Sequence, residues 1–178
     1  GMGPLHLGTD GGGSIRIPCS FTGLFGIKPS FGRVPAWPLS PFGTVAHVGP
    51  MSRDVADAAL MLTVMSLPDA RDWHALPYEP RDYRAGLEKG VRGLRIAYSP
   101  NLDTLRVDPD VATAVAAAAR AFEALGAKVE EVKTGFADSH EMIRLIWAAH
   151  YIGNYGQFLE QWRSRMDPGL VACMDEGK

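Results

Sequence analysis

The stretch from Gly8 to Pro18, with the sequence Gly-Thr-Asp-Gly-Gly-Gly-Ser-Ile-Arg-Ile-Pro, constrains the fold of this chain more than any other. Three consecutive glycines lead into Ser14, with Asp10 four positions before that serine and Arg16 two positions after it. Glycine loses more backbone freedom on folding than any other residue, so a run of three is costly to order. The stretch therefore predicts a backbone that bends sharply or closely approaches another group.

Three interpretations of this stretch compete. A phosphate-binding loop is disfavoured, because the lysine of a P-loop is absent and Arg16 occupies the third glycine position of the dinucleotide fingerprint. A nucleophile loop would use Ser14 to attack a carbonyl, with backbone N–H groups holding the oxyanion. It would differ from the nucleophile elbow of α/β-hydrolases, because Ile15 and Arg16 follow the serine where a glycine is needed. A tight packing turn is the third interpretation, and the pattern alone does not separate it from the second.

The composition excludes several classes of protein. The 178 residues include 46% hydrophobic and 21% charged residues, which is typical of a globular protein. The formal net charge is -2 and the basic residues are scattered, which argues against direct nucleic-acid binding. Cys19 and Cys173 are far apart, which predicts neither a disulfide scaffold nor a zinc site and favours a reducing compartment, the cytoplasm. No apolar run is long enough to span a membrane, and no secretory signal is recognisable.

The chain is expected to form one α/β domain over residues 1–178, incomplete at both ends, in three segments. Residues 1–66 carry the glycine stretch, 67–93 form a polar connection with several prolines, and 94–178 form a β-α-β unit followed by a last helix. In the first segment the pattern predicts a short buried strand at 5–7 and a helix at 18–25 ending at Gly26. It also predicts an ordered loop from Gly32 to Gly43 and a helix at 53–66 capped by Ser52. In the last it predicts parallel strands at 94–98 and 127–132, a helix between Pro109 and Gly126, and a helix from about Asp138 to Met166.

The amino-acid sequence of the first segment strongly resembles the sequences of the amidase signature family. The matching residues are dense over 3–65 and include Gly8-Thr9-Asp10, Gly12 to Pro18, Phe21, Gly23, Gly26, Lys28-Pro29, Gly32-Arg33-Val34 and Gly49-Pro50-Met51. Downstream, the strands and helix between 94 and 132 are placed as in that family. The resemblance implies an α/β fold with a mixed, largely parallel sheet flanked by helices on both faces.

Members of that family cleave or transfer acyl groups at carboxamide bonds with a serine nucleophile, a second serine in a cis peptide, and a lysine. The resemblance implies that Ser14 is the nucleophile and that the backbone N–H groups of Gly11, Gly12, Gly13 and Ser14 form the oxyanion hole. It implies a small-molecule amide substrate and no metal or other cofactor. Asp10 and Arg16 are expected to fix the loop rather than to carry protons.

The family's lysine and cis serine lie upstream of the Gly-Thr-Asp motif, where this chain has nine residues without lysine or serine. Lys28 belongs to the Lys-Pro motif that follows the nucleophile, so it is not the missing base. We therefore expect a piece of a longer protein that is inactive by itself and self-associates, as a homo-oligomer, through uncovered surfaces. Trp37 and Phe42, in the proline-rich loop, are candidates for lining the acyl pocket.

A stand-alone amidase is the leading function. The main alternative is the glutaminase subunit of a tRNA-dependent amidotransferase, which usually carries glutamine where Ile17 stands and a different loop at 35–42. A specialised ureide activity, such as allophanate hydrolysis, and a non-catalytic interaction module also stay open. The five histidines are expected to serve packing or to face solvent, and packing is also expected for the aromatic stripe of Tyr151, Tyr155, Phe158 and Trp162.

Overall fold

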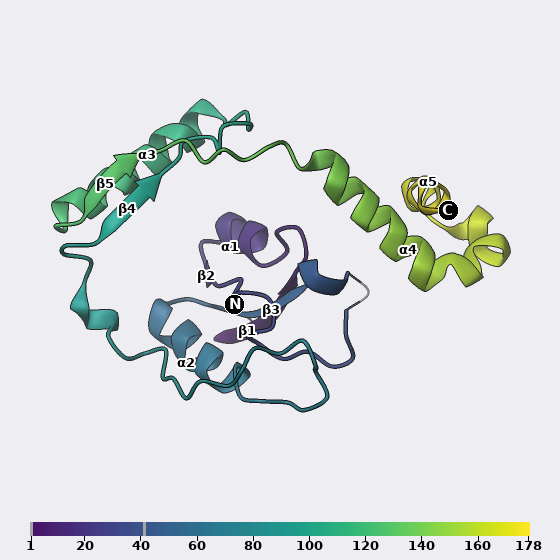
Figure 1. Ribbon diagram of the computed structural model, residues 1–178, viewed down its shortest axis with the longest axis horizontal. Coiled ribbons are helices and arrows are strands. Elements are labelled where there is room, and N and C mark those ends of the chain that lie inside the picture. The colour runs from purple at the N-terminus through teal and green to yellow at the C-terminus, as the bar shows by residue number, and fades with distance from the viewer. Residues whose placement is uncertain (1, 41) are drawn as a thin grey trace. The chain divides into compact units, whose positions relative to one another are not determined.

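The computed structural model describes residues 2–40 and 42–178, so Pro41, within the proline-rich loop, lies outside the described residues. The chain, whose helices and strands are labelled in Figure 1, divides into two compact units. The first comprises Gly1–Ala85 together with Arg144–Lys178, and the second comprises Gly86–Ile143. The helices and strands of both units confirm the α/β class.

A three-stranded antiparallel sheet carries the glycine stretch. Its order is β1-β3-β2, formed by β1 (Leu5–Asp10), β2 (Phe25–Gly26) and β3 (His47–Ser52). The strand predicted at 5–7 is confirmed and extends to Asp10, where it runs directly into the glycines, but the prediction that it is buried is wrong, because Leu5 and Leu7 are exposed. Asp10 pairs with His47 across the two longer strands. The sheet therefore places the start of the glycine stretch beside the start of β3.

The central strand β3 has an unusual sequence, because it contains Gly49 and Pro50. Proline cannot donate to a ladder and is normally excluded from central strands. Here β2 pairs only with Met51 and Ser52, and the carbonyl of Pro50 accepts a hydrogen bond from the Ile27 amide at 3.1 Å. A Cβ on Gly49 would lie 2.0 Å from the Ile27 carbonyl oxygen, so this close approach requires glycine.

The helices of this segment differ in their bounds from the prediction. Helix α1 spans Arg16–Thr22 and ends at Gly23, which adopts the left-handed conformation, so Gly26 is not its end but part of β2. Helix α2 spans Val55–Met65, and its N-cap is Asp54, whose carboxylate accepts from the Asp57 amide. Ser52 is not the cap, because it is the buried last residue of β3 and donates its hydroxyl to the Asp54 carbonyl at 2.7 Å.

Two further helices complete the first unit, the earlier of them from Arg144 onward. Helix α4 (His140–Trp162) follows the predicted course, with Asp138 accepting from the His140 amide at its start. A short 3-10 turn (Arg163–Arg165) leads to α5 (Pro168–Gly177), which the sequence analysis did not predict. The contact between α4 and α5 is tight, since a Cβ on Gly177 would lie 2.2 Å from the Ala148 carbonyl oxygen. The buried side chains of the two helices are Ala148, Leu159 and Met174.

The second unit is a β-α-β unit and confirms the prediction for this region. Strands β4 (Arg95–Tyr98) and β5 (Lys128–Glu131) pair in parallel, and α3 (Pro109–Ala124) connects them. Asp108 caps α3 by accepting from the Asp110 amide, with Pro109 in the first turn. Within the described residues parallel pairing is confined to this two-stranded sheet, so these residues alone do not form the expected largely parallel sheet. No helix in the described part of the chain combines the length and apolar character of a membrane span.

Candidate active site

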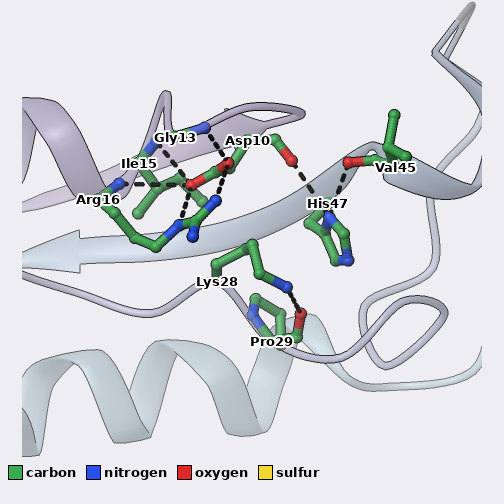
Figure 2. Close-up of polar contacts among 8 residues, drawn as sticks. All are labelled: Asp10, Gly13, Ile15, Arg16, Lys28, Pro29, Val45 and His47. Atoms are coloured by element: carbon green, nitrogen blue, oxygen red, sulfur yellow. Dashed lines mark hydrogen bonds and ion pairs between the residues drawn. The ribbon is translucent and has the colours of Figure 1, made fainter. Parts of the chain in front are cut away.

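Asp10 organises the glycine stretch. Its fully buried carboxylate, at the end of β1, accepts hydrogen bonds from the backbone amides of Gly13 (2.6 Å) and Ile15 (3.2 Å) (Figure 2). Arg16 adds a bidentate ion pair, with Nε and Nη2 each 2.9 Å from a carboxylate oxygen. Hydrogen bonding from Arg16, assisted by the loop amides, holds the pKa of Asp10 far below its ordinary value, although burial opposes the shift. The loop-structuring roles predicted for Asp10 and Arg16 fit this geometry.

His47 fixes the same loop from the other side. Its Nδ1 lies 2.9 Å from the Val45 carbonyl oxygen and 3.2 Å from the Asp10 carbonyl oxygen (Figure 2). Because carbonyl oxygens only accept, Nδ1 carries the proton and donates. The prediction that this histidine serves packing therefore misses a positioning contact with the backbone of Asp10.

Ser14 stands exposed between two buried neighbours, Gly13 and Ile15. Gly13 adopts φ 130°, a conformation that favours glycine, and its carbonyl accepts from the Ile17 amide at 2.7 Å as α1 begins. Ile15 is fully buried and anchors the turn. In the part of the chain that the structure describes, the Ser14 hydroxyl makes no hydrogen bond. Alternation of buried and exposed residues thus presents this one hydroxyl outward.

The amide groups around Ser14 are not equivalent. Among the described residues, the N–H groups of Gly11, Gly12 and Ser14 donate to no protein acceptor, whereas the Gly13 N–H is committed to Asp10. Three of the four amides expected to form an oxyanion hole are therefore uncommitted. A hydroxyl beside uncommitted backbone amides is the arrangement that attack on a carbonyl and stabilisation of the resulting oxyanion require.

The structure places no proton acceptor on Ser14 within the described residues. Lys28, which follows the nucleophile in sequence, donates from Nζ to the Pro29 carbonyl oxygen at 3.1 Å (Figure 2). No group of three or more His, Cys, Asp or Glu side chains in the described ranges is placed to hold a metal ion.

A cavity of about 240 Å³ lies beside the loop. It is lined by aromatic, aliphatic and a few polar side chains, among them Phe42, His47, His74 and Asp72. The buried Asp72 shapes it by accepting from the amides of Ala36 and His74, both at 2.9 Å. None of the residues from Gly11 to Ser14 lines the cavity, so it adjoins the loop without containing the serine.

The two residues expected to line a substrate pocket differ in their surroundings. Phe42 lines the cavity and is half-buried, whereas Trp37 is 57% exposed and is not among the lining residues. Its neighbour Ala36 lines the cavity instead. The role of Trp37 therefore stays a prediction without structural support, and Phe42 is the better placed of the two.

Trp147, on α4, is a site residue that the sequence analysis did not identify. A Cβ placed on Gly11 would lie 3.2 Å from Cη2 of Trp147, and one placed on Gly12 would lie 3.6 Å from the same atom. The Trp147 ring also stacks on Phe42, with centroids 4.6 Å apart. No local pattern signals this contact, because the partners lie far apart in sequence and only the packing of α4 brings them together.

Comparison with known proteins gives a consistent result. The family model described as Amidase matches residues 1–167. The acylamidase of Rhodococcus erythropolis is 38% identical over 181 aligned positions, which cover 100% of this chain and 38% of the relative. In Ligilactobacillus salivarius, the A subunit of the glutamyl-tRNA(Gln) amidotransferase is 44% identical, over 71% of this chain and 26% of the relative. The chain thus spans less than two fifths of the length of these relatives.

Solved structures give the same picture. A bacterial aryl acylamidase of the amidase signature family superposes with a TM-score of 0.85 at 33% identity, over 98% of this chain and 38% of that chain. A 6-aminohexanoate cyclic dimer hydrolase complexed with substrate superposes with a TM-score of 0.78 at 25% identity, over 98% of this chain and 42% of that chain.

Proposed function

Since this chain belongs to the Amidase family, we propose that the protein that carries it hydrolyses carboxamide C–N bonds through a serine acyl-enzyme. The single observation that carries the proposal is the exposed hydroxyl of Ser14 beside the uncommitted amides of Gly11 and Gly12, on a loop that Asp10 holds in place. Electrostatic stabilisation by preorganised donors is usually the largest single contribution to such catalysis.

In the proposed reaction, the Ser14 oxygen attacks the carbonyl carbon of a small amide. The oxyanion accepts hydrogen bonds from the N–H groups of Gly11, Gly12 and Ser14. The amine leaves with the proton that Ser14 gave up, and water then hydrolyses the ester. The proton carriers, a second serine and a lysine of depressed pKa, are proposed to lie in sequence outside these residues, and no step requires a metal or another cofactor.

The stand-alone amidase is favoured over the glutaminase component of an amidotransferase by two observations. The acylamidase similarity covers the whole chain, whereas the amidotransferase relatives match 71–74% of it. Ile17, which is 54% exposed at the start of α1, stands where the glutaminase usually carries glutamine. A specialised ureide activity and an interaction module without catalysis are the remaining alternatives, and the range of substrates that the full-length protein hydrolyses separates these functions.

Several finer features are proposed for the whole protein. We propose that residues 1–178 belong to one domain, in which one mixed, largely parallel sheet has helices on both faces. The exposed Leu7 on β1 and Phe21 on α1 support this, since such apolar surface is normally covered. In the 178-residue chain alone this apolar surface is not covered, and we expect it to drive self-association. A cytoplasmic location is proposed from the free Cys19 and Cys173.

The test is amide hydrolysis by the full-length protein and its Ser14→Ala variant, with Ser20→Ala as a matched control on the exposed face of α1. The Ser14→Ala variant is expected to lose at least about a thousandfold in kcat, and Ser20→Ala less than about twofold. Hydrolysis of glutamine alone among the amides offered would favour the amidotransferase glutaminase. Absence of hydrolysis of every amide would favour the interaction module.

A further inference from the structure

Two aromatic rings from distant parts of the first unit meet beside the glycine stretch. Trp147 of α4 stacks on Phe42 of the proline-rich loop, with ring planes inclined by 28°. The far edge of the same indole ring covers the Cα positions of Gly11 and Gly12, where a side chain would find Cη2 at 3.2 and 3.6 Å. The indole therefore lies next to two of the three uncommitted amides of the loop.

Further ring contacts hold Phe42 against α4. The Phe42 and Tyr151 rings form a T-shaped pair with centroids 5.6 Å apart, and the Phe42 and His150 ring centroids lie 6.1 Å apart, with both partners on α4. Gly43, at φ 54°, allows the loop to approach α4, because a Cβ there would lie 3.2 Å from Nε2 of His150. Phe42 is thus fixed against the helix and supports one side of the Trp147 ring.

The pair is not sealed inside this chain. Trp147 and Phe42 are both half-buried, and Gly12 beside the indole and Ser14, two residues further along the chain, are exposed. A ring that is supported on one side and partly open offers a flat apolar surface to a further ring, which gains contact area without ordering a flexible side chain. A saturated ring of the same size is puckered and matches such a surface less closely.

We propose that Trp147, backed by Phe42, is a specificity-determining residue that packs against a planar aromatic group attached to the scissile amide. This inference rests on the proposed amidase function and adds to it the substrate class, an aryl amide. With the amide carbonyl at the N–H groups of Gly11 and Gly12, a ring attached to either end of the amide lies within reach of the indole. The aryl group can therefore belong to the acyl part or to the amine part.

The test compares planar and saturated rings in the full-length protein. Benzamide is paired with cyclohexanecarboxamide, which varies the acyl part, and acetanilide is paired with N-cyclohexylacetamide, which varies the amine part. The readout is the ratio of kcat/KM for the planar amide to that for the saturated amide, compared between the wild type and each variant. The active enzyme concentration cancels within each ratio. The intrinsic reactivities of the two amides cancel when the ratios of two proteins are compared. Trp147→Leu is expected to lower the planar-to-saturated ratio about tenfold or more in one pair, and that pair identifies the part bearing the ring.

Two variants serve as controls. Trp147→Phe keeps a flat ring and is expected to retain the ratio within about threefold, which also covers the case in which Trp147→Leu fails to fold. Trp162→Leu makes the same change on the same helix at a residue whose ring contacts Arg165 instead of the glycine loop, and should leave the ratio unchanged. Equal losses for planar and saturated amides, or no change in either pair, would overturn the inference and leave the amidase function standing. Absence of hydrolysis by the unsubstituted protein would overturn both.

Discussion

Arg16 clamps the buried carboxylate of Asp10 with two hydrogen bonds of 2.9 Å, one from Nε to Oδ2 and one from Nη2 to Oδ1. The same carboxylate accepts hydrogen bonds from the backbone amides of Gly13 and Ile15, the residues on either side of Ser14. One side chain thus fixes the backbone before and after the proposed nucleophile. The arrangement explains why an acidic and a basic residue flank the glycines at this spacing.

Replacing Asp10 with Asn should be costly, because it leaves Arg16 without its partner and weakens the acceptor for the loop amides. We expect the free energy of unfolding to fall by about 2–3 kcal/mol, measured by urea denaturation. Arg16→Leu should cost less, about 1 kcal/mol, because the Arg16 side chain is 55% exposed and the amides of Gly13 and Ile15 still satisfy the carboxylate. A larger loss from Arg16→Leu than from Asp10→Asn would contradict this account of the clamp.

The lowered pKa of Asp10 predicts acid sensitivity. A carboxylate whose pKa in the folded state lies below its unfolded value of about 4 stabilises the fold above that pH, and this contribution is lost as the pH falls further. The difference in unfolding free energy between the wild type and Asp10→Asn should therefore be constant from about pH 7 to pH 5 and shrink below pH 4. The exposed carboxylates Asp69, Asp82 and Asp175 also have lowered pKa values, but they are common to both proteins and cancel. A difference that stays unchanged down to pH 2 would show that the ionised form of Asp10 is not what stabilises the loop.

Gly49 and Gly153 offer a matched pair of substitutions with opposite expected signs. In β3, a Cβ on Gly49 would lie 2.0 Å from a backbone oxygen, so Gly49→Ala should lower the unfolding free energy by more than about 3 kcal/mol. In α4, Gly153 is exposed and a Cβ there meets nothing within 4 Å, so Gly153→Ala should raise it by up to about 1 kcal/mol. Thermal or urea unfolding of both variants checks this, and a Gly49→Ala protein as stable as the wild type would refute the described approach of β3 to Ile27.

The elements with strong local signals could be predicted from the sequence. The β-α-β unit is the clearest case, because Asp108 and Pro109 define the start of its helix and Gly126 follows its end, with a short strand on each side. The same Asp-Pro signal is present at Asp167 and Pro168, where α5 begins. This helix was not predicted, because the helix ending near Met166 was taken to be the last one. Strand β3 could not be predicted, because Gly49 and Pro50 argue locally against a central strand and only the short β2 makes room for them.

Some residues of the candidate site could likewise be predicted from the sequence, and others could not. Asp10, Ser14 and Arg16 lie within one short stretch, so their association could be predicted from their spacing. Trp147 could not, because its contact with the glycines depends on how α4 packs against the glycine loop within the first unit. The hydrogen bond from the Gly13 amide to Asp10 likewise depends on the backbone conformation of the loop, which the residue types alone do not specify.

The central claim is that Ser14 is the nucleophile, and the most direct test is to identify the residue that a fluorophosphonate probe labels. The full-length protein and the 178-residue chain alone should each be treated with the probe, digested and analysed by mass spectrometry. We predict a single adduct on Ser14 in the full-length protein and none in the chain alone, whose Ser14 hydroxyl contacts no proton acceptor among the described residues. An adduct on a different serine of the full-length protein, with Ser14 unmodified, would contradict the account.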